Sequence, residues 1–356
     1  MPTATFQLVA QSVMQEYLPA ITIDDSGTVA IWDDAASRAG RVSAPQPIAN
    51  PIQLADGPSR DSGAASIGDQ SMVVWLRNDD LWAQRVDAAG NSIGAPIYIA
   101  FTDSRHTQRM AIGASRDHYL VVWEIQSRIL ASVLDANGNI LDFAIPLMTG
   151  EFGRNVERIS VASNGTEFLV AWDASTSEPW VTPCALECPA ADRDVHAVIV
   201  NDDGTPRSET ERVIGSGGDP DVASNGRDYL IAWSRFGGGI SAMTISSGFA
   251  SASDPIAITT ARDFGAHAGF DGTMYDVAWI NADASPVLAG KRITTTGAVA
   301  EPIATGRVYS GFQSRDFDLT ARDGKIVLAV PADGHLHLQV LSVTPAPPAR
   351  VRAVRH

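Results

Sequence analysis

The chain has 356 residues, of which 45% are hydrophobic and 19% charged, a balance typical of a protein that buries a large core. Its formal net charge of −15 argues against a nucleic acid as partner, because affinity for a phosphate backbone depends on clustered lysine and arginine. No apolar run reaches the roughly 18 residues of a membrane span, so we expect no segment that crosses a bilayer.

The first twenty residues, MPTATFQLVAQSVMQEYLPA, lack a basic segment followed by an apolar one and so contain no visible signal peptide. Only two cysteines occur, Cys184 and Cys188, close together in a Pro-rich insert. A disulfide between them would favour an oxidising compartment, so we expect an extracellular or periplasmic protein, and a monomer. A zinc site would need more ligands than the nearby His196, and we predict no metal and no cofactor.

A repeated pair of strands organises the chain, as in Asp219–Trp233, DPDVASNGRDYLIAW. A short strand leads into a tight turn, and a second, apolar strand ends in Trp. Gly, Asn and Asp in these turns supply the positive φ values that tight hairpins demand. The Trp recurs at intervals of roughly 50 residues, typical of a four-stranded repeat unit. Its copies are Trp32, Trp75, Trp123, Trp172, Trp233 and Trp279, and Gly324–Pro331 is a seventh copy without it.

Two further strands follow each Trp. The third strand has a small residue before an apolar pair, as in LWAQRV at 81–86 and ILASVL at 129–134. A second tight turn, such as DAAGN at 87–91, leads to a fourth strand such as APIYIA at 95–100. No long segment has a helical period, so the pattern predicts meandering antiparallel sheets of four strands.

The two ends of the chain complement each other. The last unit has its third strand at 335–343 but no fourth, whereas ATFQLVA at 4–10 has the fourth-strand pattern before the first unit. Pairing these segments would close a ring and remove an exposed sheet edge. We therefore predict an all-β, seven-bladed β-propeller over residues 1–343, with four antiparallel strands per blade and the N-terminal strand closing the last blade. Residues 344–356 form a Pro- and Arg-rich tail.

The repeats at Ala162–Trp172, Ala223–Trp233 and Val86–Gly90 resemble those of bacterial, often secreted, seven-bladed propeller proteins built from ASNGxxYLVAW…VDxxG units. The resemblance covers nearly the whole chain and implies the same architecture. Those proteins are mostly uncharacterised, so the resemblance implies no catalytic residues.

Connections of a propeller emerge on two faces, and here the two sets differ. The turns within the first and second hairpins are uniformly tight, whereas the connections on the other face are longer and irregular, as at 172–195, 235–239 and 305–316. Function concentrates on variable loops over a rigid scaffold. The long-loop face is therefore the predicted site.

Arginine recurs on that face just before the first strand of a blade. Two interpretations stay open: an arginine ring that holds a carboxylate, sulfate or phosphate, or arginines that pair with aspartates of the next blade and fasten the ring. Gly217-Gly218-Asp219 and Gln15-Glu16 interrupt the series. With two exposed aromatic residues for glycan or protein contacts, the predicted ligand-binding residues are Arg60, Arg105, Arg154, Arg262, Arg315, Trp180 and Tyr309.

Three further residues near the mouth, His106, His267 and Asp263, are candidates for acid or base catalysis. No established catalytic motif occurs in its structural context. We therefore predict a non-catalytic binding or interaction module for a glycan or an extracellular protein. The alternative is an enzyme, a lyase or hydrolase, acting on an anionic polysaccharide-like substrate at the channel mouth.

Overall fold

The computed structural model describes residues 3–10, 19–25, 27–33, 37–41, 51–56, 61–102, 110–126, 128–148, 156–175, 193–281, 287–303, 317–332 and 335–342. These residues form strands and two short 3-10 helices, η2 (Ser208–Thr210) and η3 (Ser247–Phe249), with no α-helix among them. Neither of these short helices is long and apolar enough to span a membrane. The predicted all-β class is confirmed.

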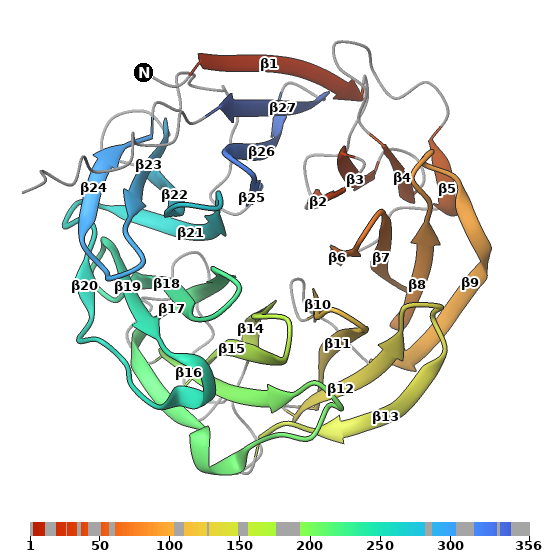
Figure 1. Ribbon diagram of the computed structural model, residues 1–356, viewed down its shortest axis with the longest axis horizontal. Coiled ribbons are helices and arrows are strands. Elements are labelled where there is room, and N and C mark those ends of the chain that lie inside the picture. The colour runs from red at the N-terminus through yellow and green to blue at the C-terminus, as the bar shows by residue number, and fades with distance from the viewer. Residues whose placement is uncertain are drawn as a thin grey trace, which may run out of the picture.

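The strands form six antiparallel sheets arranged in a ring (Figure 1). Three of the four-stranded sheets follow one another along the chain. They are β2 (Ala20–Asp24), β3 (Gly27–Asp33), β4 (Ser37–Arg41) and β5 (Ile52–Ala55); β6 (Asp61–Ile67), β7 (Gln70–Arg77), β8 (Asp80–Val86) and β9 (Ser92–Phe101); and β10 (Met110–Ala114), β11 (His118–Ile125), β12 (Arg128–Asp135) and β13 (Ile140–Pro146).

The remaining sheets complete the ring. One has seven strands: β14 (Val156–Ser163), β15 (Glu167–Ser175), β16 (Arg193–Asn201), β17 (Arg212–Ser224), β18 (Tyr229–Arg235), β19 (Ile240–Ile245) and β20 (Ile256–Ala257). The next contains β21 (Asp263–Phe270), β22 (Tyr275–Asn281), β23 (Val287–Ile293) and β24 (Val299–Pro302). The last contains β25 (Asp318–Arg322), β26 (Lys325–Ala332), β27 (His335–Ser342) and β1 (Thr3–Ala10).

The seven-stranded sheet is continuous because β17 takes part in two pairings. Its first part, residues 212–216, pairs with β16, and its second part, residues 217–224, pairs with β18. The chain bends between the two parts, where Gly217 has a φ of 138° and Asp219 a φ of 52°. A Cβ on Gly217 would lie 2.1 Å from the carbonyl oxygen of Ser234, so only glycine fits there. The segment that interrupted the arginine series in the sequence is therefore this bend.

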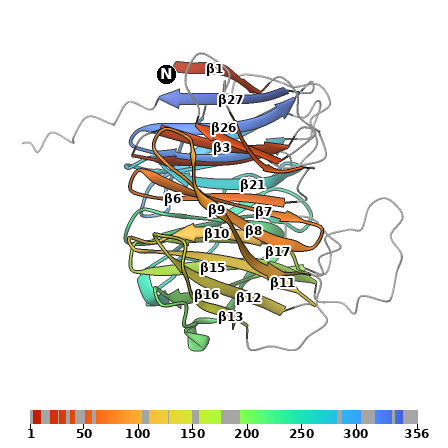
Figure 2. The same cartoon turned by 90° about the vertical axis from the view of Figure 1, so that its right-hand side faces the viewer.

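The N-terminal strand lies beside the last strand, as the sequences of the two chain ends predicted. β1 pairs antiparallel with β27, with register partners from Thr3↔Ser342 to Ala10↔Leu336. Both views show β1 beside β27 at the outside of the ring (Figures 1 and 2). The first and last strands that the structure describes thus share one sheet.

The repeated turns have the same local chemistry in successive sheets. In the turn before β18, the side-chain oxygen of Asn225 accepts hydrogen bonds from the backbone N–H groups of Arg227 and Asp228, and Gly226 has a φ of 84°. Asp271 accepts the corresponding bonds in the turn before β22. Short polar side chains of this kind stabilise a tight turn by bonding its backbone. The recurring Asn, Asp and Gly letters are therefore structural.

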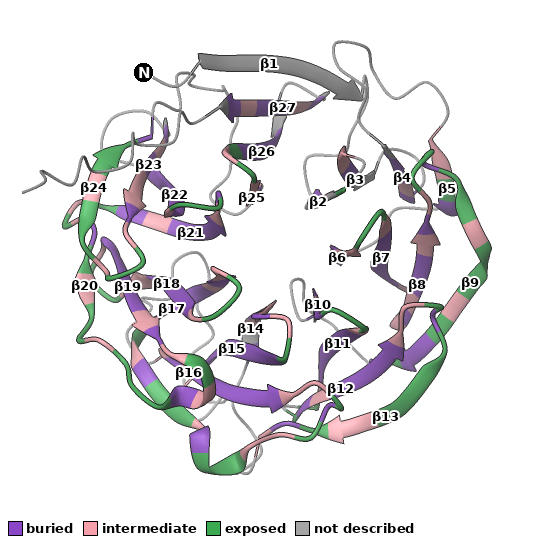
Figure 3. Cartoon of the chain, viewed as in Figure 1, coloured by how far each residue is buried: buried purple, intermediate pink, exposed green. Residues whose placement is uncertain are grey.

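The core lies between adjacent sheets. Trp123 of β11 packs with Met72 and Leu76 of the preceding sheet, and Trp172 of β15 packs with Leu120 and Val122. Burial is greatest along the middle strands, whereas the outer strands β9, β13 and β24 carry much exposed surface (Figure 3). The Trp-ended strand is thus scaffold, and a functional site must lie at the outer rim or along the innermost strands.

Candidate functional site

A cavity of about 320 Å³ lies at the centre of the ring. It is lined by residues of β2, β6, β10, β14, β17, β21 and β25, the innermost strand of each sheet segment. A volume near 300 Å³ is at the lower end of the range for small-molecule sites. The cavity can therefore hold a small ligand, or one end of a larger one.

One register position of the cavity wall is polar on some of these strands and apolar on the others. The position is defined by its strand partner, which immediately precedes the repeated Trp or its equivalent. On four consecutive strands, β14, β17, β21 and β25, it is polar, and it holds Ser160, Asp221, His267 and Asp318. On β2, β6 and β10 it holds Ala20, Gly63 and Ala111. The three residues on β2, β6 and β10 have no polar side-chain group.

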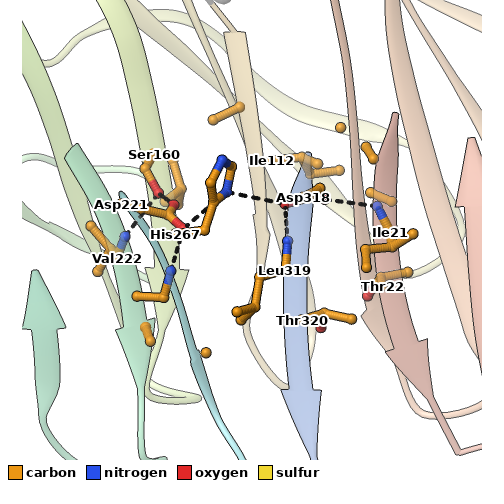
Figure 4. Close-up of a pocket in the computed structure, with 18 of the residues that line it drawn as sticks. Ile21, Thr22, Ile112, Ser160, Asp221, Val222, His267, Asp318, Leu319 and Thr320 are labelled. Atoms are coloured by element: carbon orange, nitrogen blue, oxygen red, sulfur yellow. Dashed lines mark hydrogen bonds and ion pairs between the residues drawn. The ribbon is translucent and has the colours of Figure 1, made fainter. Parts of the chain in front are cut away.

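Asp221 on β17 is held by donors from both neighbouring strands. Its Oδ1 accepts a hydrogen bond of 2.6 Å from the Ser160 hydroxyl, and its Oδ2 accepts one of 2.8 Å from the backbone N–H of Ala268 (Figure 4). The Ser160 oxygen in turn accepts a bond from the N–H of Val222. These bonds fix the orientation of the carboxylate at the cavity wall.

Asp318 on β25 is fixed in the same way. Its Oδ2 accepts a 2.8 Å hydrogen bond from the N–H of Ile21 on β2, and its Oδ1 accepts one from the N–H of Leu319. Burial raises the pKa of Asp318 to about 6, against the lowering effect of these bonds and of the Arg158 charge. This carboxylate therefore joins the last sheet to the first and changes its charge near pH 6.

His267 lies between the two carboxylates (Figure 4), its Nδ1 3.7 Å from an oxygen of Asp221 and 3.6 Å from one of Asp318. Its ring packs on Phe317, with ring centroids 4.3 Å apart. Burial and then the Arg158 charge lower the pKa of His267 to about 3, so the imidazole is neutral at pH 7. The two contacts with carboxylates are therefore not ion pairs at that pH.

Arg158 on β14 contacts His267 on β21 along the cavity wall. Its Nη2 lies 3.1 Å from Nδ1 and 3.2 Å from Nε2 of the imidazole. A neutral imidazole accepts through one nitrogen only. Because Nδ1 faces the carboxylates, we assign the proton to Nδ1 and the acceptor role to Nε2. Among the described residues, Arg158 has no carboxylate within ion-pair distance, and its side chain is half-buried.

Two further aspartates, Asp61 in the cavity lining and Asp173 outside it, also join neighbouring strands. Asp61 accepts a 3.2 Å hydrogen bond from the N–H of Met110 on the next sheet. Asp173 is 1% exposed and accepts bonds from the N–H groups of Arg158 and Asp219 and from the Arg193 guanidinium, 2.9 Å away. These two aspartates thus fasten adjacent strands through backbone N–H groups, and Asp173 does so through Arg193 as well.

Of the predicted site residues, the structure describes Arg262, Asp263 and His267. His267 lines the cavity, whereas Arg262 is exposed and does not line it. Asp263 is buried, accepts a 2.8 Å bond from the Asn281 side chain and also lies outside the cavity lining. The others stay predictions because they lie outside the described residues, as do the two cysteines: Arg60, Arg105, Arg154, Arg315, Trp180, Tyr309, His106, Cys184 and Cys188.

Sequence reasoning missed Arg158, Ser160, Asp221 and Asp318. A signal for three of them was present, because they occupy the repeat position opposite the residue before the Trp. Comparing the repeats at that one position would have separated the polar residues from Ala20, Gly63 and Ala111. The described part of the chain contains no group of three or more His, Cys, Asp or Glu arranged to hold a metal ion.

No family model and no curated protein sequence matches the chain. Solved structures do resemble it. The BP39L lectin from Burkholderia pseudomallei has a TM-score of 0.67 and 14% identity, covering 92% of this chain and 96% of the lectin. The Cps50 (Swd1) β-propeller domain from Myceliophteria thermophila has a TM-score of 0.56 and 9% identity, covering 94% of this chain and 100% of that domain. At such identities the likeness establishes the fold, a β-propeller.

Proposed function

We propose that this chain is a non-catalytic module that binds one end of a glycan in its central cavity. The observation that carries the proposal is the asymmetric wall: Asp221, Asp318, His267 and Arg158 converge on one side, opposite small residues on β2, β6 and β10. Carboxylates that accept and a guanidinium that donates match the hydroxyl groups of a sugar. The fold likeness to a lectin agrees with this function.

The proposal includes seven blades. The continuous seven-stranded sheet divides within β17, whose two halves pair with different strands, so it counts as two blades. Seven innermost strands line the cavity. We place the binding site at the end of the cavity where these strands begin, which is the long-loop side, and a secreted location would suit a glycan-binding protein.

The cavity favours a glycan over a protein partner as occupant. A cavity of about 320 Å³ accommodates one small chemical group. A stable protein–protein interface instead covers a broad surface and buries about 1,200 Å² or more. His267 is a poor general base, because a group with a pKa of about 3 binds a proton weakly at neutral pH. The alternative of a lyase or hydrolase stays a prediction, and the binding experiment includes its test.

The test is a glycan-array screen of the full chain, followed by calorimetry on the best binder with Asp221→Asn and Asp318→Asn. Each variant removes one charged acceptor at the wall, which is worth about 1.5–3 kcal/mol, so we expect about a tenfold or greater loss of affinity. Asp254→Asn, at an exposed position on the outer rim, is the matched control and should bind as wild type. Thermal unfolding verifies that each variant is folded.

Two results would overturn the proposal: no glycan binds, or folded Asp221→Asn and Asp318→Asn proteins bind as tightly as wild type. Incubating the bound glycan with the wild-type protein and analysing it by mass spectrometry tests the enzyme alternative. If the wild-type protein forms cleavage products and the Asp221→Asn protein does not, the chain is an enzyme rather than a non-catalytic module.

A further inference from the structure

We infer that the glycan end that enters the cavity is a uronic acid, whose carboxylate binds Arg158. This inference rests on the proposed function and adds the class of sugar. It starts from a difference in hydrogen bonding at the cavity wall. The carboxylates of Asp221 and Asp318 already accept bonds from protein donors, whereas Arg158 has no carboxylate partner among the described residues.

The acceptors at the wall already have donors from the protein. Both oxygens of Asp221 are bonded, to the Ser160 hydroxyl and the Ala268 N–H, and both oxygens of Asp318 are bonded to backbone N–H groups. Each carboxylate oxygen keeps a second lone pair, so it can accept one further bond from a sugar hydroxyl. The carboxylates therefore need no cation from the ligand.

The N–H donors of Arg158, in contrast, have few acceptors among the described protein groups. A guanidinium carries five N–H donors, and the only side-chain partner of Arg158 among the described residues is the His267 ring. Its other donors lie at a cavity wall with no carboxylate in ion-pair contact. An arginine in this position matches a ligand carboxylate, whose two oxygens accept parallel bonds from the planar fork. The ligand group that Arg158 binds best is thus an anion, such as a carboxylate.

Because His267 is neutral, it can hold Arg158 at the cavity wall without neutralising its charge, so the guanidinium can bind a ligand carboxylate. A protonated imidazole would repel the guanidinium, whereas a neutral one accepts its N–H through Nε2 and holds it on the cavity side. Burial and the arginine charge keep the pKa of His267 low, which agrees with this geometry. His267 is therefore a positioning residue for Arg158.

The charge of the whole chain restricts the ligand to one acidic residue rather than a polyanion. A formal net charge of −15 repels a densely charged polysaccharide over the distance of the Debye length, about 8–10 Å. A single carboxylate inside the cavity is instead governed by its contact with Arg158. A uronic acid at the end of an otherwise neutral glycan satisfies both conditions, and its hydroxyl groups reach Asp221 and Asp318.

The test compares methyl glucuronoside with methyl glucoside and with the methyl ester of methyl glucuronoside, using calorimetry on the full chain. Wild type should bind the glucuronoside at least about tenfold more tightly than either neutral sugar, as expected for a charge-assisted bond. Arg158→Gln should abolish this preference, because it removes the charge that distinguishes binding of the glucuronoside from binding of the two neutral sugars. Arg158→Lys should keep part of the preference. Arg262→Gln, at an exposed arginine outside the cavity, is the control.

The outcomes separate this inference from the proposed function. Equal binding of all three sugars, or a preference that survives in Arg158→Gln, would overturn the uronic acid while leaving the glycan module intact. Failure of every saccharide on the array would overturn both. If Arg158→Gln does not fold, the comparison of the glucuronoside with its methyl ester on wild type decides the matter, because the ester lacks the charge and adds only a methyl group.

Discussion

Removing β1 is a direct test of how the ring is held closed. Deletion of residues 1–10 takes away a strand that has seven register pairs with β27. Cross-strand pairs contribute roughly 0.2–1 kcal/mol each, so the deletion should cost about 1.5–7 kcal/mol. Because domains are stable by only about 5–15 kcal/mol, this is a large fraction of the total. It also leaves β27 as an unpaired edge, which promotes association between molecules.

The assay is thermal and urea unfolding followed by circular dichroism, together with size-exclusion chromatography. The truncated protein should unfold at a lower temperature and lower urea concentration and should self-associate. Added peptide of residues 1–10 should restore part of the stability by pairing with β27. The matched control is a truncation after residue 343, which removes only the tail predicted from the sequence and should leave the midpoint unchanged.

Closure by β1 would be refuted if the protein lacking residues 1–10 unfolded at the same midpoint as the full chain and stayed monomeric. The closing contacts between β25 and β2 would then hold the ring without β1. In them the N–H of Ile21 donates to Asp318, and Arg322 donates to the carbonyl oxygen of Ile23.

Three further predictions concern buried polar groups. Asp276 is 0% exposed, and burial, then the nearby Asp271 charge, raise its pKa to about 7, so its ionisation destabilises the fold as pH rises from 3.8 through about 7. Asp276→Asn should therefore reduce this pH dependence, by at most about 3 kcal/mol, in urea unfolding between pH 5 and 8; an unchanged pH dependence would contradict the assignment. Tyr229→Phe removes a buried 3.0 Å bond to the carbonyl oxygen of Glu167 and should cost about 1 kcal/mol in the same assay; no measurable loss would mean that this bond between strands contributes nothing. Lowering the pH from 7 to 5 protonates Asp318, which has a pKa of about 6, and so removes a charged acceptor, as Asp318→Asn does. Calorimetry should therefore show weaker binding of methyl glucoside at pH 5 than at pH 7; an affinity that is unchanged or higher would contradict the role of Asp318 as an acceptor.

The fold was predictable from the sequence because its signals are local and repeated. The turn residues at 224–228 and the strand ending in Trp233 identify a hairpin by themselves, and their recurrence predicts how many such hairpins occur. The partnership of residues 4–10 with the last strand was also accessible, since each end carries the complement of the other. The division of β17 between two pairings was not, because it depends on a bend at Gly217 that the repeat pattern does not encode.

The site was less predictable for a physical reason. The arginine series predicted a site on the loops. The polar residues of the cavity wall lie instead on the innermost strands, within the repeated pattern that also determines the fold. Asp221 lies inside the repeated pair of strands at Asp219–Trp233, and Asp318 precedes the seventh copy at Gly324–Pro331, so neither carries a motif of its own. Their proximity to His267 arises only when the ring closes and brings β14, β17, β21 and β25 side by side.

The most direct test of the binding site is a crystal structure of the full chain with methyl glucuronoside or with the best glycan from the array. We predict density for the sugar in the central cavity, with its hydroxyl groups within hydrogen-bond distance of Asp221 or Asp318 and its carboxylate on Arg158. A sugar bound on the outer strands of the ring, with the central cavity holding only water, would contradict the account.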